Sequence, residues 1–135
     1  MARDTALLAF DRGDVMPLEA AVQHLLAVCH GLSDRAGWWA DVDRDNPYVV
    51  GTKLMLVVSE VAEAMEGHRK GINDTHLQHR PMVEVELADA MIRICDLAGA
   101  LGLDLAGAVV EKLQYNQQRA DHKREHRAGA NGKRY

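Results

Sequence analysis

Residues 81–101 read PMVEVELADAMIRICDLAGAL, and this stretch decides the fold. Its apolar side chains recur at helical spacing around most of the circumference, which is typical of a helix that packs against several neighbours. Gly102 follows and is suited to end such a helix. We therefore predict a central helix over 81–101 in an all-α protein.

The flanking sequence continues the helical pattern. Apolar spacing predicts further helices over about 17–30, 51–67 and 105–119, with Gly31 ending the first, Gly67 or Gly71 ending the second and Asp104 capping the third. Residues 37–47 lack periodicity and predict a loop, and 121–135 are polar and predict a basic tail that orders only on a ligand or partner. We expect a four-helix bundle in one domain over 1–135, with its core at about 18–120 and its tail at about 121–135.

Composition excludes several classes of protein. The chain has 135 residues, a formal net charge of −4 and 47% hydrophobic residues, as expected of one soluble domain. Cys29 and Cys95 form no C-x-x-C pair, which favours a reducing compartment. No run approaches the roughly 18–20 apolar residues of a membrane span. Asp4 is an acid in the N-terminal region, where a signal peptide would carry only basic residues. These features indicate a cytoplasmic protein without a membrane partner.

Acidic side chains share one face of the 81–101 helix. At 100° per residue, Glu86, Asp89, Arg93 and Asp96 fall within one narrow sector. A buried carboxylate without a partner costs several kcal/mol, so this face requires a cation or hydrogen bonds. One alternative is structural, because Asp89 can pair with Arg93 at i, i+4.

A second acidic pair, Glu60 and Glu63, lies at i, i+3 on the 51–67 helix. Two such pairs on facing helices form a pocket of carboxylate oxygens, which suits Mg²⁺, with Mn²⁺ as a substitute. Mg²⁺ keeps coordination positions for water and substrate phosphates, so a phosphate ester is the expected substrate. The predicted metal ligands are Glu60, Glu63, Glu86 and Asp89. Acids at this spacing are also common on solvated helix faces.

The C-terminal part of the chain is basic. From Lys112 onward there are seven Lys or Arg residues against two acids. At spacings of i, i+4, i+7 and i+11, a continuous helix would place on one face Lys112, Asn116, Arg119 and Lys123. Such a face can bind phosphates, or it can be a solvated helix end that the helix dipole favours.

The acidic and basic motifs together resemble the MazG-like family of all-α nucleoside triphosphate pyrophosphohydrolases. The family pattern is Glu-Glu-x-x-Glu, a spacer, then Glu-x-x-Asp. It appears here as Ser59-Glu60-Val61-Ala62-Glu63 and Glu86-Leu87-Ala88-Asp89, followed by Lys112-Leu113-Gln114-Tyr115-Asn116-Gln117-Gln118-Arg119. The resemblance covers about residues 18–135. Ser59 departs from the pattern, since many members have Glu there.

The resemblance implies a reaction and a set of roles. A (deoxy)nucleoside triphosphate would be hydrolysed between its α and β phosphates to the monophosphate and pyrophosphate, in nucleotide-pool cleaning. Glu60, Glu63, Glu86 and Asp89 would hold the metal, and Glu60 or Glu63 would activate water. Lys112, Arg119 and Lys123 would bind phosphates and Asn116 the sugar or base. Family members are dimers or tetramers, so we expect a homodimer or homotetramer without a stable nucleic-acid partner.

The two tryptophans, Trp38 and Trp39, are adjacent in the predicted loop. A nucleobase stacked on one of them would gain about 1–3 kcal/mol, by analogy with single-stranded nucleic acids. The alternative is that at least one of the rings covers the core beneath its loop.

Three competing interpretations follow from the same sequence. Residues 122–126 read HKREH, which matches the inverted zinc-peptidase motif His-x-x-Glu-His, but Lys123 and Arg124 would repel a metal ion. The acidic and basic faces can instead pair in a non-enzymatic oligomerisation or regulatory module. The chemistry can also act on phosphoribosyl-ATP, as in the related enzymes of the histidine pathway.

Overall fold

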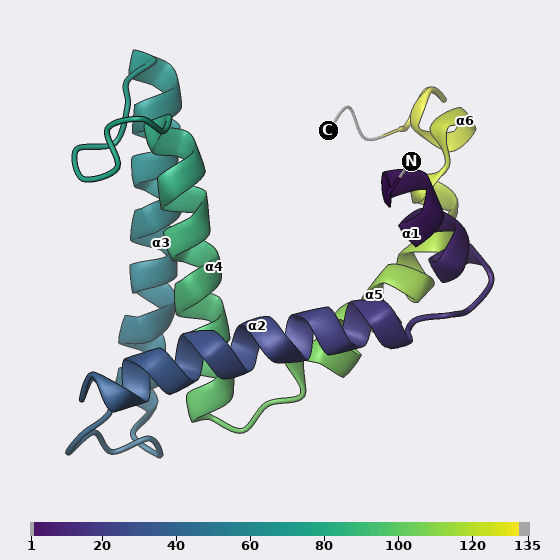
Figure 1. Ribbon diagram of the computed structural model, residues 1–135. Coiled ribbons are helices and arrows are strands. Elements are labelled where there is room, and N and C mark those ends of the chain that lie inside the picture. Colours follow the sequence, from purple (N-terminus) through teal and green to yellow (C-terminus); the bar gives the residue numbers. More distant parts are fainter. Residues whose placement is uncertain (1, 133–135) are drawn as a thin grey trace. The chain divides into compact units, whose positions relative to one another are not determined.

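The computed structural model describes residues 2–132, and the regular elements within that range are helices (Figure 1). The helices are α1 (Ala2–Asp11), α2 (Met16–Arg35), α3 (Pro47–Lys70), α4 (Met82–Ala100), α5 (Leu105–Gln118) and α6 (Arg124–Arg127), with a 3₁₀ turn η1 (Ala120–His122). The one β-type pairing among the described residues is an isolated bridge between Asn73 and Pro81. The all-α prediction is confirmed.

Contacts divide the chain into two compact units, where the sequence predicted a single domain. One unit comprises 24–103, and the other comprises 1–23 together with 104–135. The candidate site lies within 24–103, so this unit is described first and the other one separately.

The α3–α4 hairpin forms the long axis of the 24–103 unit, and its two helices run antiparallel side by side (Figure 1). The side chain of Asn46 accepts a hydrogen bond from the backbone N–H of Tyr48 and so caps α3. Gly71 ends α3 in the left-handed conformation, at φ 63°, which suits glycine. These caps make α3 longer than the predicted 51–67, and α4 agrees with the predicted 81–101 to within one residue at each end.

The turn that closes the hairpin is organised by Asp74. This carboxylate is buried, and its Oδ2 accepts hydrogen bonds from the backbone N–H groups of His76 at 2.7 Å and Leu77 at 3.3 Å. Gly67 allows α4 to approach, because a Cβ there would lie 2.8 Å from the Cβ of Met82. The hairpin therefore has a fixed turn, which sets the register between α3 and α4.

The loop after α2 packs against α4 through a small core of Trp39, Leu97 and Ala100, with Val42, Val49 and Leu101 around it. The predicted helix end at Gly31 is wrong, because α2 continues to Arg35. His30 and Ser33 both hydrogen-bond Asp96 of α4 and hold the helix together beyond the glycine.

The other unit contains α1, which the sequence pattern did not predict, and α5, whose predicted cap is confirmed: Asp104 Oδ1 accepts from the backbone N–H of Gly107 at 2.9 Å. Helix α5 ends at Gln118, and Arg119 is extended at ψ 130°. The prediction that Arg119 and Lys123 continue one helical face from Lys112 is therefore wrong. The tail forms the short turns η1 and α6, and residues 133–135 lie outside the described range.

Among the described residues, no single helix is long and apolar enough to cross a bilayer. One bent pair, 3–11 with 16–35, passes by length and composition alone.

Candidate metal centre

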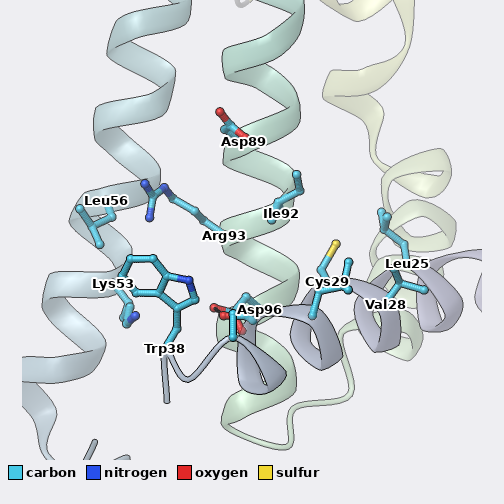
Figure 2. Close-up of a pocket in the computed structure, with 13 residues that line it drawn as sticks. Leu25, Val28, Cys29, Trp38, Lys53, Leu56, Asp89, Ile92, Arg93 and Asp96 are labelled. Atoms are coloured by element: carbon cyan, nitrogen blue, oxygen red, sulfur yellow. Dashed lines mark hydrogen bonds between the residues drawn. The ribbon is translucent and has the colours of Figure 1, made fainter. Parts of the chain in front are cut away.

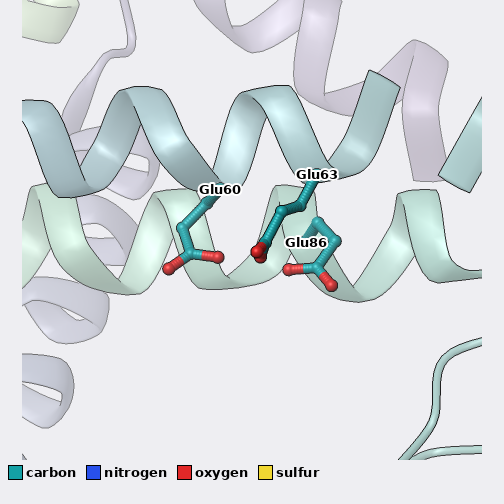
Figure 3. A group of neighbouring side chains, drawn as sticks. All are labelled: Glu60, Glu63 and Glu86. Atoms are coloured by element: carbon teal, nitrogen blue, oxygen red, sulfur yellow. The ribbon is translucent and has the colours of Figure 1, made fainter. Parts of the chain in front are cut away.

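Three of the four predicted metal ligands converge on one side of the α3–α4 hairpin (Figure 3). Glu60 and Glu63 extend from adjacent turns of α3, and Glu86 extends from α4. Each offers a carboxylate oxygen, and these oxygens all lie within 4.8 Å of one another. Opposite oxygens around Mg²⁺ are about 4.2 Å apart, so small side-chain movements would fit the trio to this ion or to Mn²⁺.

The electrostatics of the trio favour a cation. The pKa of Glu86 is raised to about 7, first by burial, then by the charges of Glu63 and Glu60 and by a hydrogen bond with Glu60, with a smaller contribution from Asp89. A bound cation would relieve this repulsion between like charges. The donor set consists only of oxygen atoms, which matches the preference of hard divalent ions.

Asp89 lies one turn beyond Glu86 and is not part of the group within 4.8 Å. Burial, and then the charge of Glu60, raises its pKa. Asp89 instead lines the neighbouring cavity. The structure thus brings three predicted ligands together and places the fourth beside them.

Arg93 pairs with the trio in a way that the sequence did not predict. Its Nε donates to Glu60 Oε1 at 2.5 Å, and the Glu60 side chain is only 9% exposed. The i, i+4 alternative had Arg93 pair with Asp89 on its own helix. Residue spacing along the sequence predicts only contacts within one helix, whereas this ion pair joins α4 to α3.

A cavity of about 660 Å³ lies next to the trio, between the end of α2 and the hairpin (Figure 2). Its wall is mainly apolar, with Leu25, Val28, Leu32, Leu56 and Ile92. Its polar groups are Ser33, Lys53, Asp89, Arg93 and Asp96, and Trp38 forms part of its border. An apolar cavity with a few charged groups is typical of a small-molecule site.

The two tryptophans have different environments. Trp38 is 69% exposed and lines the cavity, whereas Trp39 is 4% exposed and belongs to the core. Trp39 Nε1 donates to Asp96 Oδ1 at 2.7 Å, and Lys53 Nζ lies 4.5 Å from the Trp39 ring centroid. The core interpretation is therefore right for Trp39, and Trp38 alone remains a candidate for stacking.

Asp96, in the cavity wall, joins three segments: α2, the loop after it and α4. It accepts hydrogen bonds from Trp39 and from Ser33 Oγ, the latter at 2.9 Å, and His30 Nδ1 lies 2.9 Å from its Oδ1. The sequence placed Asp96 in the acidic sector but gave it no partner. Through these contacts Asp96 holds α2 and the following loop against α4, and so positions this part of the cavity wall.

The predicted phosphate-binding residues lie in the other unit, and their roles stay predictions. Lys112 Nζ lies 4.8 Å from the ring centroid of Tyr115. Arg119 is bound by Asp121, with its Nε 2.9 Å from Oδ1. Asn116 Oδ1 is buried and lacks a hydrogen-bond partner among the described residues.

The zinc-peptidase motif at 122–126 gains no support. Within 2–132, the only group of acids, histidines or cysteines close enough to hold a metal is the trio.

No protein-family profile, curated protein or solved structure matches the chain. The candidate site is therefore supported by the geometry and chemistry of its own residues alone.

Proposed function

We propose that this protein is a magnesium-dependent nucleoside triphosphate pyrophosphohydrolase of the MazG-like type, which releases the monophosphate and pyrophosphate. The observation that carries the proposal is the convergence of Glu60, Glu63 and Glu86 from two helices. The cavity beside them supports a small-molecule substrate, because it combines apolar walls with cationic groups.

The carboxylates have distinct roles in this proposal. Glu60, Glu63 and Glu86 hold the ion, and Asp89, one turn beyond Glu86, completes the set only if its side chain turns from the cavity toward them. Bound Mg²⁺ supplies charge neutralisation of the triphosphate and polarisation of its α-phosphoryl group. Glu60 is buried against Arg93, whereas Glu63 is exposed. We therefore assign to Glu63 the orientation and deprotonation of the attacking water.

The cavity supports binding of the nucleoside. The Trp38 ring is accessible at its border, so a base can stack there (Figure 2). Lys53 and Arg93 lie on the same cavity and offer positive charge to the phosphates.

Exposed apolar side chains on the hairpin support assembly with further copies of the chain. Leu54, Val58, Val61 and Met65 recur along one face of α3, and each is at least half exposed. Leu87 and Met91 on α4 are also at least half exposed. We propose that a second copy covers these residues, so that two hairpins form the four-helix bundle of a homodimer or of half a homotetramer.

The test measures pyrophosphate and orthophosphate released from ribo- and deoxyribonucleoside triphosphates, with Mg²⁺ and then with a chelator. We expect pyrophosphate release that needs Mg²⁺ and favours particular bases. Phosphoribosyl-ATP is included in the panel, because its hydrolysis would keep the chemistry and change the substrate. The absence of release from every compound would refute the enzyme proposal.

The Glu60–Arg93 ion pair favours one other function, a non-enzymatic helical module in which a guanidinium neutralises the acids. A ligand that binds only the folded state raises the melting temperature. The enzyme should therefore be stabilised by Mg²⁺ together with a nucleotide, and the module should not.

A further inference from the structure

Arg93 connects the carboxylate trio to the cavity. Its Nε is bound to Glu60 of the trio, while the same side chain lines the cavity with Trp38 and Lys53. Figure 2 shows it extending from α4 toward α3, above the Trp38 ring. A substrate that spans from the cavity to the trio would therefore lie beside this guanidinium.

The geometry of the ion pair makes Arg93 a competitor of the metal. The guanidinium lies against Glu60 Oε1, on the same carboxylate that the proposed ion would use. A divalent cation that binds alone must approach this positive charge or displace it. The pair is unlike a surface salt bridge, because the Glu60 side chain is 9% exposed and an uncompensated charge there would be costly.

Arg93 also retains capacity for an anion. A guanidinium has five N–H donors, and in the described part of the chain only Nε is used in a hydrogen bond. The side chain is 42% exposed, so its terminal nitrogens are accessible from the cavity. Planar N–H pairs of this kind bind phosphate oxygens in a bidentate manner.

We propose that Arg93 is a built-in counter-ion that couples metal binding to phosphate binding. In the free protein its guanidinium neutralises Glu60. A polyphosphate draws the guanidinium toward the cavity, Glu60 becomes available to the metal, and each ligand tightens the binding of the other. This inference rests on the proposed function, since it needs both a metal at the trio and an anionic substrate.

The test compares Arg93→Gln with Arg69→Gln, a matched control that breaks the exposed pair of Arg69 with Glu66 on α3. Calorimetry measures Mn²⁺ binding alone and binding of the preformed Mn²⁺–pyrophosphate complex. We expect Arg93→Gln to bind Mn²⁺ about 3–10-fold more tightly, since about 1 kcal/mol of competition is removed, and to bind the complex more weakly. The control should change neither constant.

A merely structural role predicts the opposite sign for the metal, because a disturbed site binds Mn²⁺ more weakly. Unchanged or weaker Mn²⁺ binding by Arg93→Gln would overturn the inference. Arg93→Lys covers the case in which the glutamine variant does not fold: it keeps the charge and loses the planar fork. We expect Arg93→Lys to bind Mn²⁺ with wild-type affinity and to bind the Mn²⁺–pyrophosphate complex more weakly. Equal changes in these two affinities would overturn the coupling.

The wild-type protein separates the two proposals. If it binds no Mn²⁺ and releases no pyrophosphate from triphosphates, the proposed function fails and the inference fails with it. If it binds Mn²⁺ and turns over substrate but Arg93→Gln behaves like the control, only the role of Arg93 is wrong.

Discussion

At the residue scale, burial and then the neighbouring acids raise the pKa of the Glu86 carboxyl group. Its pKa of about 7 lies above that of a free glutamate, so between pH 4.5 and 7 the folded protein keeps a proton that the unfolded chain has lost. Stability of the metal-free protein therefore falls as pH rises through this window. Above pH 7, the charged Glu86 is held against the other acids at a cost.

Glu86→Gln should remove this cost. We expect the variant to be more stable than the wild type at pH 8 without metal, by about 1 kcal/mol because partial exposure screens the repulsion, and to lose that advantage at pH 4.5. Thermal unfolding at both pH values, with chelator present, measures the difference. An equal difference at both would show that Glu86 ionises normally.

The proposed catalysis depends on single carboxylates. Glu63→Gln and Asp89→Asn should abolish pyrophosphate release while the helical content by circular dichroism is kept. Glu84→Gln is the control, since Glu84 pairs with Arg80 on the surface, outside the trio. Normal turnover in either site variant would refute its assignment.

Spacing along one helix and the meeting of acidic residues from two facing helices could be predicted from the sequence, and the exact register between these helices could not. The i, i+3 rule placed Glu60 and Glu63 on one face correctly. The register that sets Glu86 beside them, and Asp89 farther from them, depends on the Asp74 turn and on the close contact at Gly67. The Glu60–Arg93 pair depends on the same register, so the spacing of residues along either helix could not predict it.

At the element scale, the approach of α2 to α4 depends on Gly99. A Cβ at this position would lie 2.5 Å from the Cβ of His30, whereas Gly31 on α2 has nothing within 4 Å. A larger side chain would therefore collide with a neighbour at Gly99 and would meet none at Gly31. Gly99 permits packing, and Gly31 is an ordinary helix position despite its predicted role as a helix end.

Substitution with alanine distinguishes the two positions. Gly99→Ala should destabilise the protein by about 1–3 kcal/mol, because the helices must separate. Gly31→Ala should stabilise it by about 0.5–1 kcal/mol through the helix propensity of alanine. Chemical denaturation measures both changes, and destabilisation by Gly31→Ala would contradict the open space seen there.

Caps explain why some helix ends were predicted and others were not. Asp104 caps α5 as expected, since its side chain acts on the next turn of the same segment. The end of α5 at Gln118 lies one residue before the predicted 119, where Arg119 leaves the helix and binds Asp121 with two nitrogens. Local cap residues thus predicted the start of α5 and, with Gly71, the end of α3, whereas α2 continues past Gly31 to a part where Ser33 contacts Asp96 of another helix.

At the scale of the whole molecule, the exposed stripe on α3 is the main feature that a single chain does not explain. The stripe of Leu54, Val58, Val61 and Met65 follows helical spacing, yet each residue is at least half exposed. The sequence assigned this face to a core. The proposed second copy would supply that core.

Val58→Glu places a charge in the stripe, and Thr52→Glu places one elsewhere on α3 as the control. We expect light scattering after gel filtration to show monomers for Val58→Glu and oligomers for the wild type and the control. Burying an unpaired charge in an apolar contact costs several kcal/mol, which is enough to dissociate a micromolar dimer. An unchanged mass for Val58→Glu would place the contact elsewhere.

The unequal exposure of the two tryptophans gives the protein its own pair of optical reporters. Trp38 borders the cavity in water and Trp39 is enclosed beside Asp96, so iodide or acrylamide in solution reaches the first indole and not the second. A base stacked on Trp38 would shield it from the quencher, whereas unfolding would expose Trp39. Emission from one unlabelled sample thus separates occupancy of the cavity from loss of the core.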